Sequence, residues 1–157
     1  MLTLSGFLLI SCHTNFEDSN YNSFTSFNNV EYRVSLSYPL GWEQNESYLV
    51  KYEGEEGYFQ LSATNGDSID TVVDREANHK LKPYGNEPQI DNLTIDNNEA
   101  RLISPSDDQP LEMQLQSSLI VRYPNSVEID NRTYHYFILW ADKDHIRKIA
   151  NSIKFLD

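Results

Sequence analysis

The segment from Thr133 to Ala141 places the strongest constraint on the fold, because it is apolar on both sides of an extended backbone. Tyr136 and Ile138 alternate with Phe137 and Leu139. Successive side chains of a strand point to opposite faces, so both faces carry large apolar groups. Such a strand lies inside a sheet that is covered on both faces. The sequence therefore predicts a layered domain built around residues 133–141.

Residues 31–42 predict a strand of a different kind. Large apolar side chains alternate with Arg and Ser along residues 32–38, which is typical of a half-buried strand. Pro39 cannot donate to a sheet and Gly41 permits a tight reversal, so we expect the strand to end there. Trp42 then turns back onto the domain as a large apolar anchor.

The other elements follow from turn residues and helical spacing. We expect, in order, a hairpin over 48–63, a helix over 69–81 capped by Asp67 or Ser68, a hairpin over 88–104 around Asp96-Asn97, a strand over 113–123, a helix after Asp142 and a short strand over 153–156. Hairpins indicate antiparallel pairing, and the two-sided strand indicates covering helices. We therefore predict an α+β fold: a mainly antiparallel sheet of six or seven strands with helices on both faces, an α/β/α sandwich.

Two motifs at the ends of this region resemble a known family. Residues 32–42 read Tyr-Arg-Val-Ser-Leu-Ser-Tyr-Pro-Leu-Gly-Trp, and residues 149–155 read Ile-Ala-Asn-Ser-Ile-Lys-Phe. They are similar to the first and last signatures of PsbP-like domains, which are α/β/α sandwiches named after a photosystem II extrinsic subunit and found in bacterial lipoproteins. The resemblance implies a PsbP-like globular domain over residues 30–157, and it brings no catalytic residues.

Residues 1–12 resemble a bacterial lipoprotein signal peptide. Their apolar run is shorter than the roughly 20 residues that span a bilayer, but it fits the apolar region of a secretory signal. The run ends in Leu9-Ile10-Ser11-Cys12, which resembles a lipobox, where a small residue precedes a lipidated cysteine. The resemblance implies that Cys12 carries a lipid anchor. The alternative is that Cys12, the single cysteine of the chain, is a free thiol in a leader segment.

Residues 13–29 are rich in Asn, Ser and Thr, and their aromatic residues follow neither a strand nor a helix period. We predict that they form a tether between the signal segment and the globular domain. A flexible coil of this length spans on the order of 20 Å. The alternative is that the aromatic residues pack onto the domain.

The charge of the chain restricts its partners. It has 24 acidic against 12 basic residues, a formal net charge of -12. This charge repels nucleic acid and anionic lipid, and it leaves cationic partners or metal ions open. Solubility alone also accounts for dispersed negative charge, and we prefer that interpretation.

Three acidic groups are weak candidates for a metal site. Asp67, Asp70 and Asp74 are spaced to share one edge of the first predicted helix, where carboxylate oxygens would suit a hard cation such as calcium. The helix dipole alone favours acidic residues in a first turn, and we prefer this explanation. The other two groups are Asp107, Asp108 with Glu112, and Asp142 with Asp144. Neither has the glycine-centred spacing of a calcium loop.

No common catalytic spacing occurs in the sequence: there is no phosphate-binding Gly-Lys-Ser loop, no His-Glu-x-x-His and no Gly-x-Ser-x-Gly. His135 has no indicated nucleophile beside it, so we interpret it as a hydrogen-bonded structural histidine. We therefore predict that the protein is not an enzyme and uses no cofactor.

Together these features predict an extracytoplasmic lipoprotein, anchored by lipid to the cell membrane, that acts as a non-enzymatic binding or accessory module. We expect its partner to be a protein of the cell envelope, not nucleic acid. The contact would lie at exposed loops near Gly41, Trp42 and Asp107. The alternative function is an acidic envelope protein that binds calcium or manganese.

Overall fold

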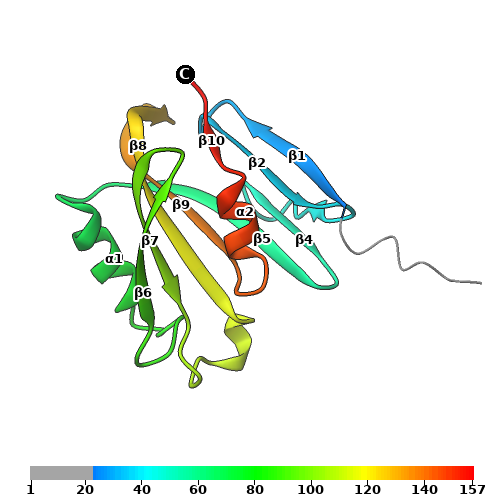
Figure 1. The fold of residues 1–157 in the computed structure, drawn as a ribbon, viewed down its shortest axis with the longest axis vertical. Coiled ribbons are helices and arrows are strands. Elements are labelled where there is room, and N and C mark those ends of the chain that lie inside the picture. The colour runs from blue at the N-terminus through cyan, green and yellow to red at the C-terminus, as the bar shows by residue number, and fades with distance from the viewer. Residues whose placement is uncertain (1–22) are drawn as a thin grey trace, which may run out of the picture.

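The computed structural model describes residues 23–157, of which 50% lie in strands and 13% in helices. The strands form two antiparallel sheets (Figure 1). The smaller sheet has the order β1-β2-β10, with β1 at Phe24–Asn29, β2 at Val34–Pro39 and β10 at Lys154–Phe155. The larger sheet has the order β3-β4-β5-β9-β8-β7-β6, with β3 at Glu43–Gln44, β4 at Lys51–Gly54, β5 at Gly57–Thr64, β6 at Gln89–Ile95, β7 at Asn98–Ser104, β8 at Gln116–Ile129 and β9 at Arg132–Asp142.

Three short helical segments complete the described chain: α1 at Ile69–Ala77, the 3-10 helix η1 at Leu111–Met113, and α2 at Ile146–Asn151. Helix α1 begins after Ser68, whose hydroxyl accepts a hydrogen bond from the backbone N–H of Thr71, as the sequence predicts for one of its two cap candidates. Among residues 23–157 we find no helix with the length and apolar character that crossing a membrane requires.

The main core lies between the two sheets. Buried side chains from β2, from one face of the larger sheet and from α2 form one apolar cluster, which includes Leu36, Phe59, Phe137, Leu139 and Ile149. The other face of the larger sheet packs against α1 and forms a second cluster with Tyr84, Tyr136 and Ile138. The two-sided character predicted for residues 133–141 is thus confirmed, since Phe137 and Tyr136 contribute to different cores.

The predicted α/β/α sandwich with helices on both faces is wrong. The described chain is mostly β, and a second antiparallel sheet lies where the prediction placed a helical layer. Helix α2 has only six residues, so it covers a small part of that face beside the strands. The error has a physical cause. A strand with two apolar faces requires cover on both sides, and a sheet buries apolar surface as well as a helix does.

The predicted tether also extends too far. Residues 24–29 form β1, which pairs with β2 along its whole length, from Phe24 opposite Pro39 to Asn29 opposite Val34. Phe27 is buried in the main core. The alternative in which aromatic residues pack onto the domain therefore holds for this part of the segment. The remainder of the predicted tether, the signal segment and Cys12 lie outside the described residues.

Both predicted hairpins form. Strand β4 pairs with β5 across the Gly54–Gly57 turn, and β6 pairs with β7 across Asp96-Asn97. The φ angles of Asp96 and Asn97 are +46° and +64°, a left-handed geometry that Asp and Asn tolerate better than most residues.

Strand β8 continues beyond its predicted end at Tyr123 and forms a long hairpin with β9. The register shifts between Arg122 and Val127, so the proline at position 124 falls in an irregular stretch where it interrupts no regular ladder. The apolar pattern that predicts the strand ends at this proline. Only the pairing of residues 127–129 with β9 shows that the strand resumes after it.

Asp96 connects the two sheets. One of its carboxylate oxygens accepts a hydrogen bond from the backbone N–H of Phe155 in β10 at 2.9 Å, and the other accepts one from Nζ of Lys154 at 2.9 Å. These bonds hold the pKa of the Asp96 carboxyl below its usual value, the backbone bond from Phe155 contributing most.

We expect Asp96→Asn to lower the free energy of unfolding by about 1 kcal/mol at neutral pH, because asparagine keeps an acceptor and the left-handed turn but loses the charge. The pKa is lower in the folded than in the unfolded state, so the charged form stabilises the fold above about pH 4. This contribution is lost as the pH falls through the folded-state pKa. Urea unfolding of both proteins should therefore show a stability difference that shrinks on acidification. A difference that is constant down to pH 2 would contradict this assignment.

Candidate binding site at the tip of the β4–β5 hairpin

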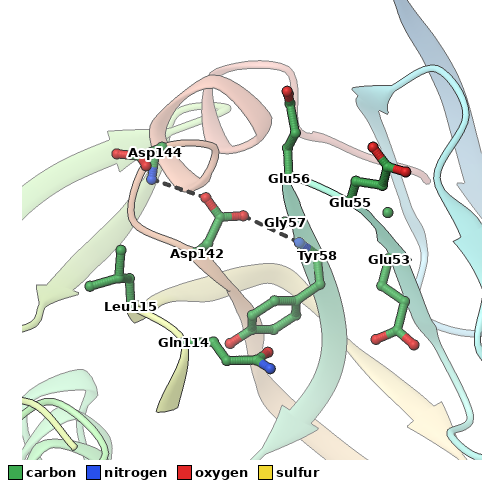
Figure 2. A pocket seen from close by; sticks show the side chains of 10 residues that line it. Glu53, Glu55, Glu56, Gly57, Tyr58, Gln114, Leu115, Asp142 and Asp144 are labelled. Atoms are coloured by element: carbon green, nitrogen blue, oxygen red, sulfur yellow. Dashed lines mark hydrogen bonds between the residues drawn. The ribbon is translucent and has the colours of Figure 1, made fainter. Parts of the chain in front are cut away.

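A hollow of about 470 Å³ opens beside the turn between β4 and β5 (Figure 2). Its lining residues are Glu53, Gly54, Glu55, Glu56, Gly57, Tyr58, Gln114, Leu115, Asp142 and Asp144. Five of them are acidic and none is basic. The hollow therefore concentrates negative charge at one end of the larger sheet.

Asp142, the last residue of β9, forms the inner wall of this hollow and is only 6% exposed. Its Oδ2 accepts a hydrogen bond from the backbone N–H of Tyr58 at 3.2 Å. Its Oδ1 accepts bonds from the backbone N–H groups of Asp144 and His145 at 3.1 and 3.2 Å, and lies 2.8 Å from Nδ1 of His145. The carboxylate thus connects β5, β9 and the turn before α2.

Two glycines let the hairpin tip approach these groups closely. A Cβ atom on Gly57 would lie 2.1 Å from Oδ2 of Asp142, and one on Gly54 would lie 2.4 Å from Cδ1 of Trp42. The indole of Trp42 is buried and meets the imidazole of His145 edge-on, with 5.0 Å between the ring centroids. Any larger residue at either glycine would push the tip away from its support.

The acidic side chains of the outer rim differ in their partners: Glu53 pairs with Nζ of Lys51 at 2.7 Å, whereas the two glutamates at the tip are free of such contacts within residues 23–157. Glu55 and Glu56 are exposed at the tip, and they make no hydrogen bond or ion pair with any residue in the described part of the chain. Figure 2 shows that the carboxylates of Glu53, Glu55, Glu56 and Asp144 point in different directions and do not converge on one point. Within residues 23–157, no group of three or more acidic, His or Cys side chains is arranged to hold a metal ion.

A second, smaller hollow of about 220 Å³ lies on the other side of the same turn and shares Gly54, Glu55 and Glu56 with the first. Its remaining lining residues are Ser23, Pro39, Leu40, Gly41 and Trp42. The side chain of Leu40 is 67% exposed, and Leu115 in the first hollow is 46% exposed. The two neighbouring carboxylates of Glu55 and Glu56 thus project between two hollows, and each hollow carries an exposed leucine.

The hydrogen-bonded groups around the hollow do not form a catalytic arrangement with a nucleophile. Tyr58 donates its hydroxyl to Oε1 of Gln116 at 3.2 Å, and burial raises the pKa of that hydroxyl far above its usual value. The pair of Asp142 and His145 has the geometry of an orienting carboxylate and an imidazole. Among residues 23–157, however, no Ser, Thr or Cys side chain is hydrogen-bonded to His145.

The predicted metal candidates on α1 do not come together. Asp70 pairs with Arg101 at 3.1 Å, and Asp74 accepts a hydrogen bond from the side-chain amide of Asn78 at 2.8 Å. Asp67 is exposed before the helix. Each carboxylate therefore lies in its own local environment.

Asp107 and Asp108 lie in a loop away from Glu112, and Asp108 is held by that loop. Its carboxylate accepts hydrogen bonds from the hydroxyl of Ser106 at 2.5 Å and from the backbone N–H of Asn86 at 3.0 Å, which lower its pKa to about 2. His135 is exposed, and its backbone N–H donates to Oδ1 of Asn65 at 3.0 Å.

Sequence reasoning found part of the site. It named Asp142 with Asp144 as a weak candidate for a metal site, and it placed a protein contact near Gly41 and Trp42. It did not bring these two loops together. It covered Glu55 and Glu56 only as part of the hairpin predicted over 48–63, and it did not single out His145. The three-residue spacing of Asp142 and His145 was a usable signal, because it places an imidazole within reach of a carboxylate in one turn.

We compared the chain with known protein families, with curated proteins and with solved structures, and found no match in any of the three comparisons. The resemblance to PsbP-like domains thus rests on the two sequence motifs alone.

We expect Gly57→Ala to lower the free energy of unfolding by about 1–3 kcal/mol, because the new methyl group collides with Oδ2 of Asp142. Chemical denaturation measures this loss. The matched background is Asp142→Ala, which removes the two colliding carboxyl atoms and leaves Nδ1 of His145, 2.9 Å from the added Cβ. In that background the added cost of Gly57→Ala should fall by at least half. Equal costs in both backgrounds would show that the close approach to Asp142 is not the cause.

Proposed function

We propose that this protein is a lipid-anchored, extracytoplasmic binding module that recognises a basic segment of an envelope protein through the tip of its β4–β5 hairpin. The observation that carries the proposal is the pair Glu55 and Glu56. Both carboxylates are exposed, unpaired within the described chain, and placed between two hollows. Unpaired carboxylates attract cationic side chains, and that attraction increases where a partner excludes water.

Exposed leucines supply apolar contacts on either side of this charge. Leu40 and Leu115 flank the tip, one in each hollow. A partner segment that carries Lys or Arg next to an apolar residue would match both features. Protein interfaces combine apolar and charged contacts, and here the charged groups lie between the two apolar ones.

The support beneath the tip favours recognition by a preformed surface. Gly54 rests on Trp42, and Gly57 rests on Asp142 and His145. A rigid tip loses little conformational entropy when a partner binds, which increases affinity for a given contact area.

A lipid on Cys12 would keep this surface near the membrane. Ser23 is the first described residue, and its carbonyl accepts a hydrogen bond from the backbone N–H of Leu40 at the rim of the second hollow. The eleven Cα-to-Cα steps from Cys12 to Ser23 reach roughly 40 Å at full extension. The acidic tip would then face partners that are themselves at or in the membrane.

The alternative of a calcium- or manganese-binding protein has no comparable support in residues 23–157, where the carboxylates of the tip diverge and those of α1 lie apart. We therefore do not propose it as the function. Calorimetric titration of the protein with each metal remains its direct test.

To test the tip, a photo-reactive residue replaces Leu40 in the native host, and crosslinked envelope proteins are identified by mass spectrometry. We expect Glu55→Gln with Glu56→Gln to reduce the specific crosslink at least fivefold. The control is Glu87→Gln with Glu128→Gln, which removes two exposed carboxylates outside both hollows and should leave the crosslink unchanged. Equal crosslinking by both pairs of variants would refute recognition by the tip.

The anchor has a separate test. We expect Cys12→Ser to abolish incorporation of a labelled fatty acid and to move the protein from the membrane fraction to the soluble fraction, since serine lacks the sulfur that carries the lipid. The crosslink from residue 40 should weaken in parallel. Unchanged fatty-acid labelling of the Cys12→Ser protein would remove the anchor from the proposal but leave the tip as a candidate surface.

A further inference from the structure

A separate groove of about 350 Å³ lies on the α1 side of the larger sheet. Its lining residues are Gln60, Glu76, His79, Leu81, Pro83, Met113, Gln116 and Trp140. None of them lines the two hollows at the hairpin tip. The groove is therefore a separate site, although Gln116 in its lining accepts a hydrogen bond from the hydroxyl of Tyr58, which lines the first hollow.

Glu76 is the one acidic residue of this groove, and two donors fix its position. Its Oε1 accepts a hydrogen bond from the hydroxyl of Tyr84 at 2.6 Å and another from the indole N–H of Trp140 at 2.7 Å. Tyr84 is fully buried, and Trp140 packs against the second core. The carboxylate is thus held rigidly at the wall of the groove by groups that cannot move away.

The charge of Glu76 is not compensated within the described chain. Its two donors are neutral, and it makes no salt bridge with any residue from 23 to 157. It lies in the last turn of α1, where the helix dipole disfavours a negative charge. A neutral glutamine could accept the same two hydrogen bonds. Neither the helix nor the hydrogen bonds therefore explain a charged residue at this position.

The rest of the groove suits a cation that carries an apolar body. The indole of Trp140 adjoins the carboxylate, and tryptophan is the side chain that attracts cations best through its ring. Leu81, Pro83 and Met113 provide apolar lining. Nδ1 of His79 accepts a hydrogen bond from the backbone N–H of Leu81 at 3.3 Å, which fixes this ring at the edge of the groove.

We propose that this groove binds a small organic ammonium ion, with its charged nitrogen at Glu76 beside the indole of Trp140 and its apolar body against Leu81, Pro83 and Met113. A carboxylate held next to an aromatic ring is a general solution for recognising ammonium groups, because it combines ionic attraction with a cation–π contact. The free Oε2 of Glu76 supplies the acceptor that the two internal donors leave open.

The test follows the two indole N–H signals of the full-length protein in a ¹H–¹⁵N spectrum, since the chain has only two tryptophans. Trp42 lies at the hairpin tip and serves as an internal control. Titration with phenethylammonium should shift the signal of Trp140 and leave that of Trp42 in place. The neutral analogue 2-phenylethanol, which has the same shape, should cause at least a tenfold weaker response.

The decisive variant is Glu76→Gln, which keeps an acceptor for Tyr84 and Trp140 but removes the charge. We expect its affinity for phenethylammonium to fall at least about tenfold while the dispersion of its spectrum shows an intact fold. Three results would overturn the proposal: no shift of the Trp140 signal in the wild-type protein at 10 mM phenethylammonium, an equal response to 2-phenylethanol, or unchanged affinity in Glu76→Gln. Each would assign Glu76 a structural role alone.

Discussion

The packing of aromatic rings around Phe59 is the interaction on which the rest of this structure depends. Phe59 is fully buried in β5, and its ring meets Phe27 and Tyr38 from the smaller sheet at centroid distances of 5.6 and 5.2 Å. It also stacks on Tyr52 of β4 at 5.2 Å and lies 6.4 Å from Trp42. One side chain therefore joins both sheets and the loop that follows β2. Burial of so many rings at one point supplies both apolar stabilisation and a defined geometry.

The hairpin tip benefits directly from this arrangement. Strands β4 and β5 are held by Phe59 and Tyr52, so the turn between them projects from a fixed base. The buried carboxylate of Asp142 then fixes the tip from the other side. Because these internal groups satisfy the packing and hydrogen bonding, Glu55 and Glu56 face solvent and have no partner within residues 23–157. Rigid support beneath unpaired charge is what distinguishes this turn from an ordinary acidic surface.

The acidic residues of this chain show that composition does not assign roles. Asp142 is buried and its oxygens are occupied by internal donors, Asp96 joins two sheets, and Glu76 is fixed by neutral donors at the wall of a groove. Glu55, in contrast, has no partner in the described chain. A net charge of -12 left cationic partners or metal ions open, and only the surroundings of each carboxylate show which ones are occupied by internal donors.

The sequence by itself determined the local structure: the alternation in residues 133–141, the left-handed turn at Asp96-Asn97 and a helix cap at Asp67 or Ser68 each act over a few neighbouring residues. Periodicity and turn chemistry are local, so a single chain segment reveals them. The tertiary structure alone decided that a second sheet covers the main core, that residues 24–29 join it, and that Glu55, Asp142 and Trp42 meet at one end. Those outcomes depend on which distant surfaces bury one another, and apolar burial is non-directional, so no local pattern specifies the partner.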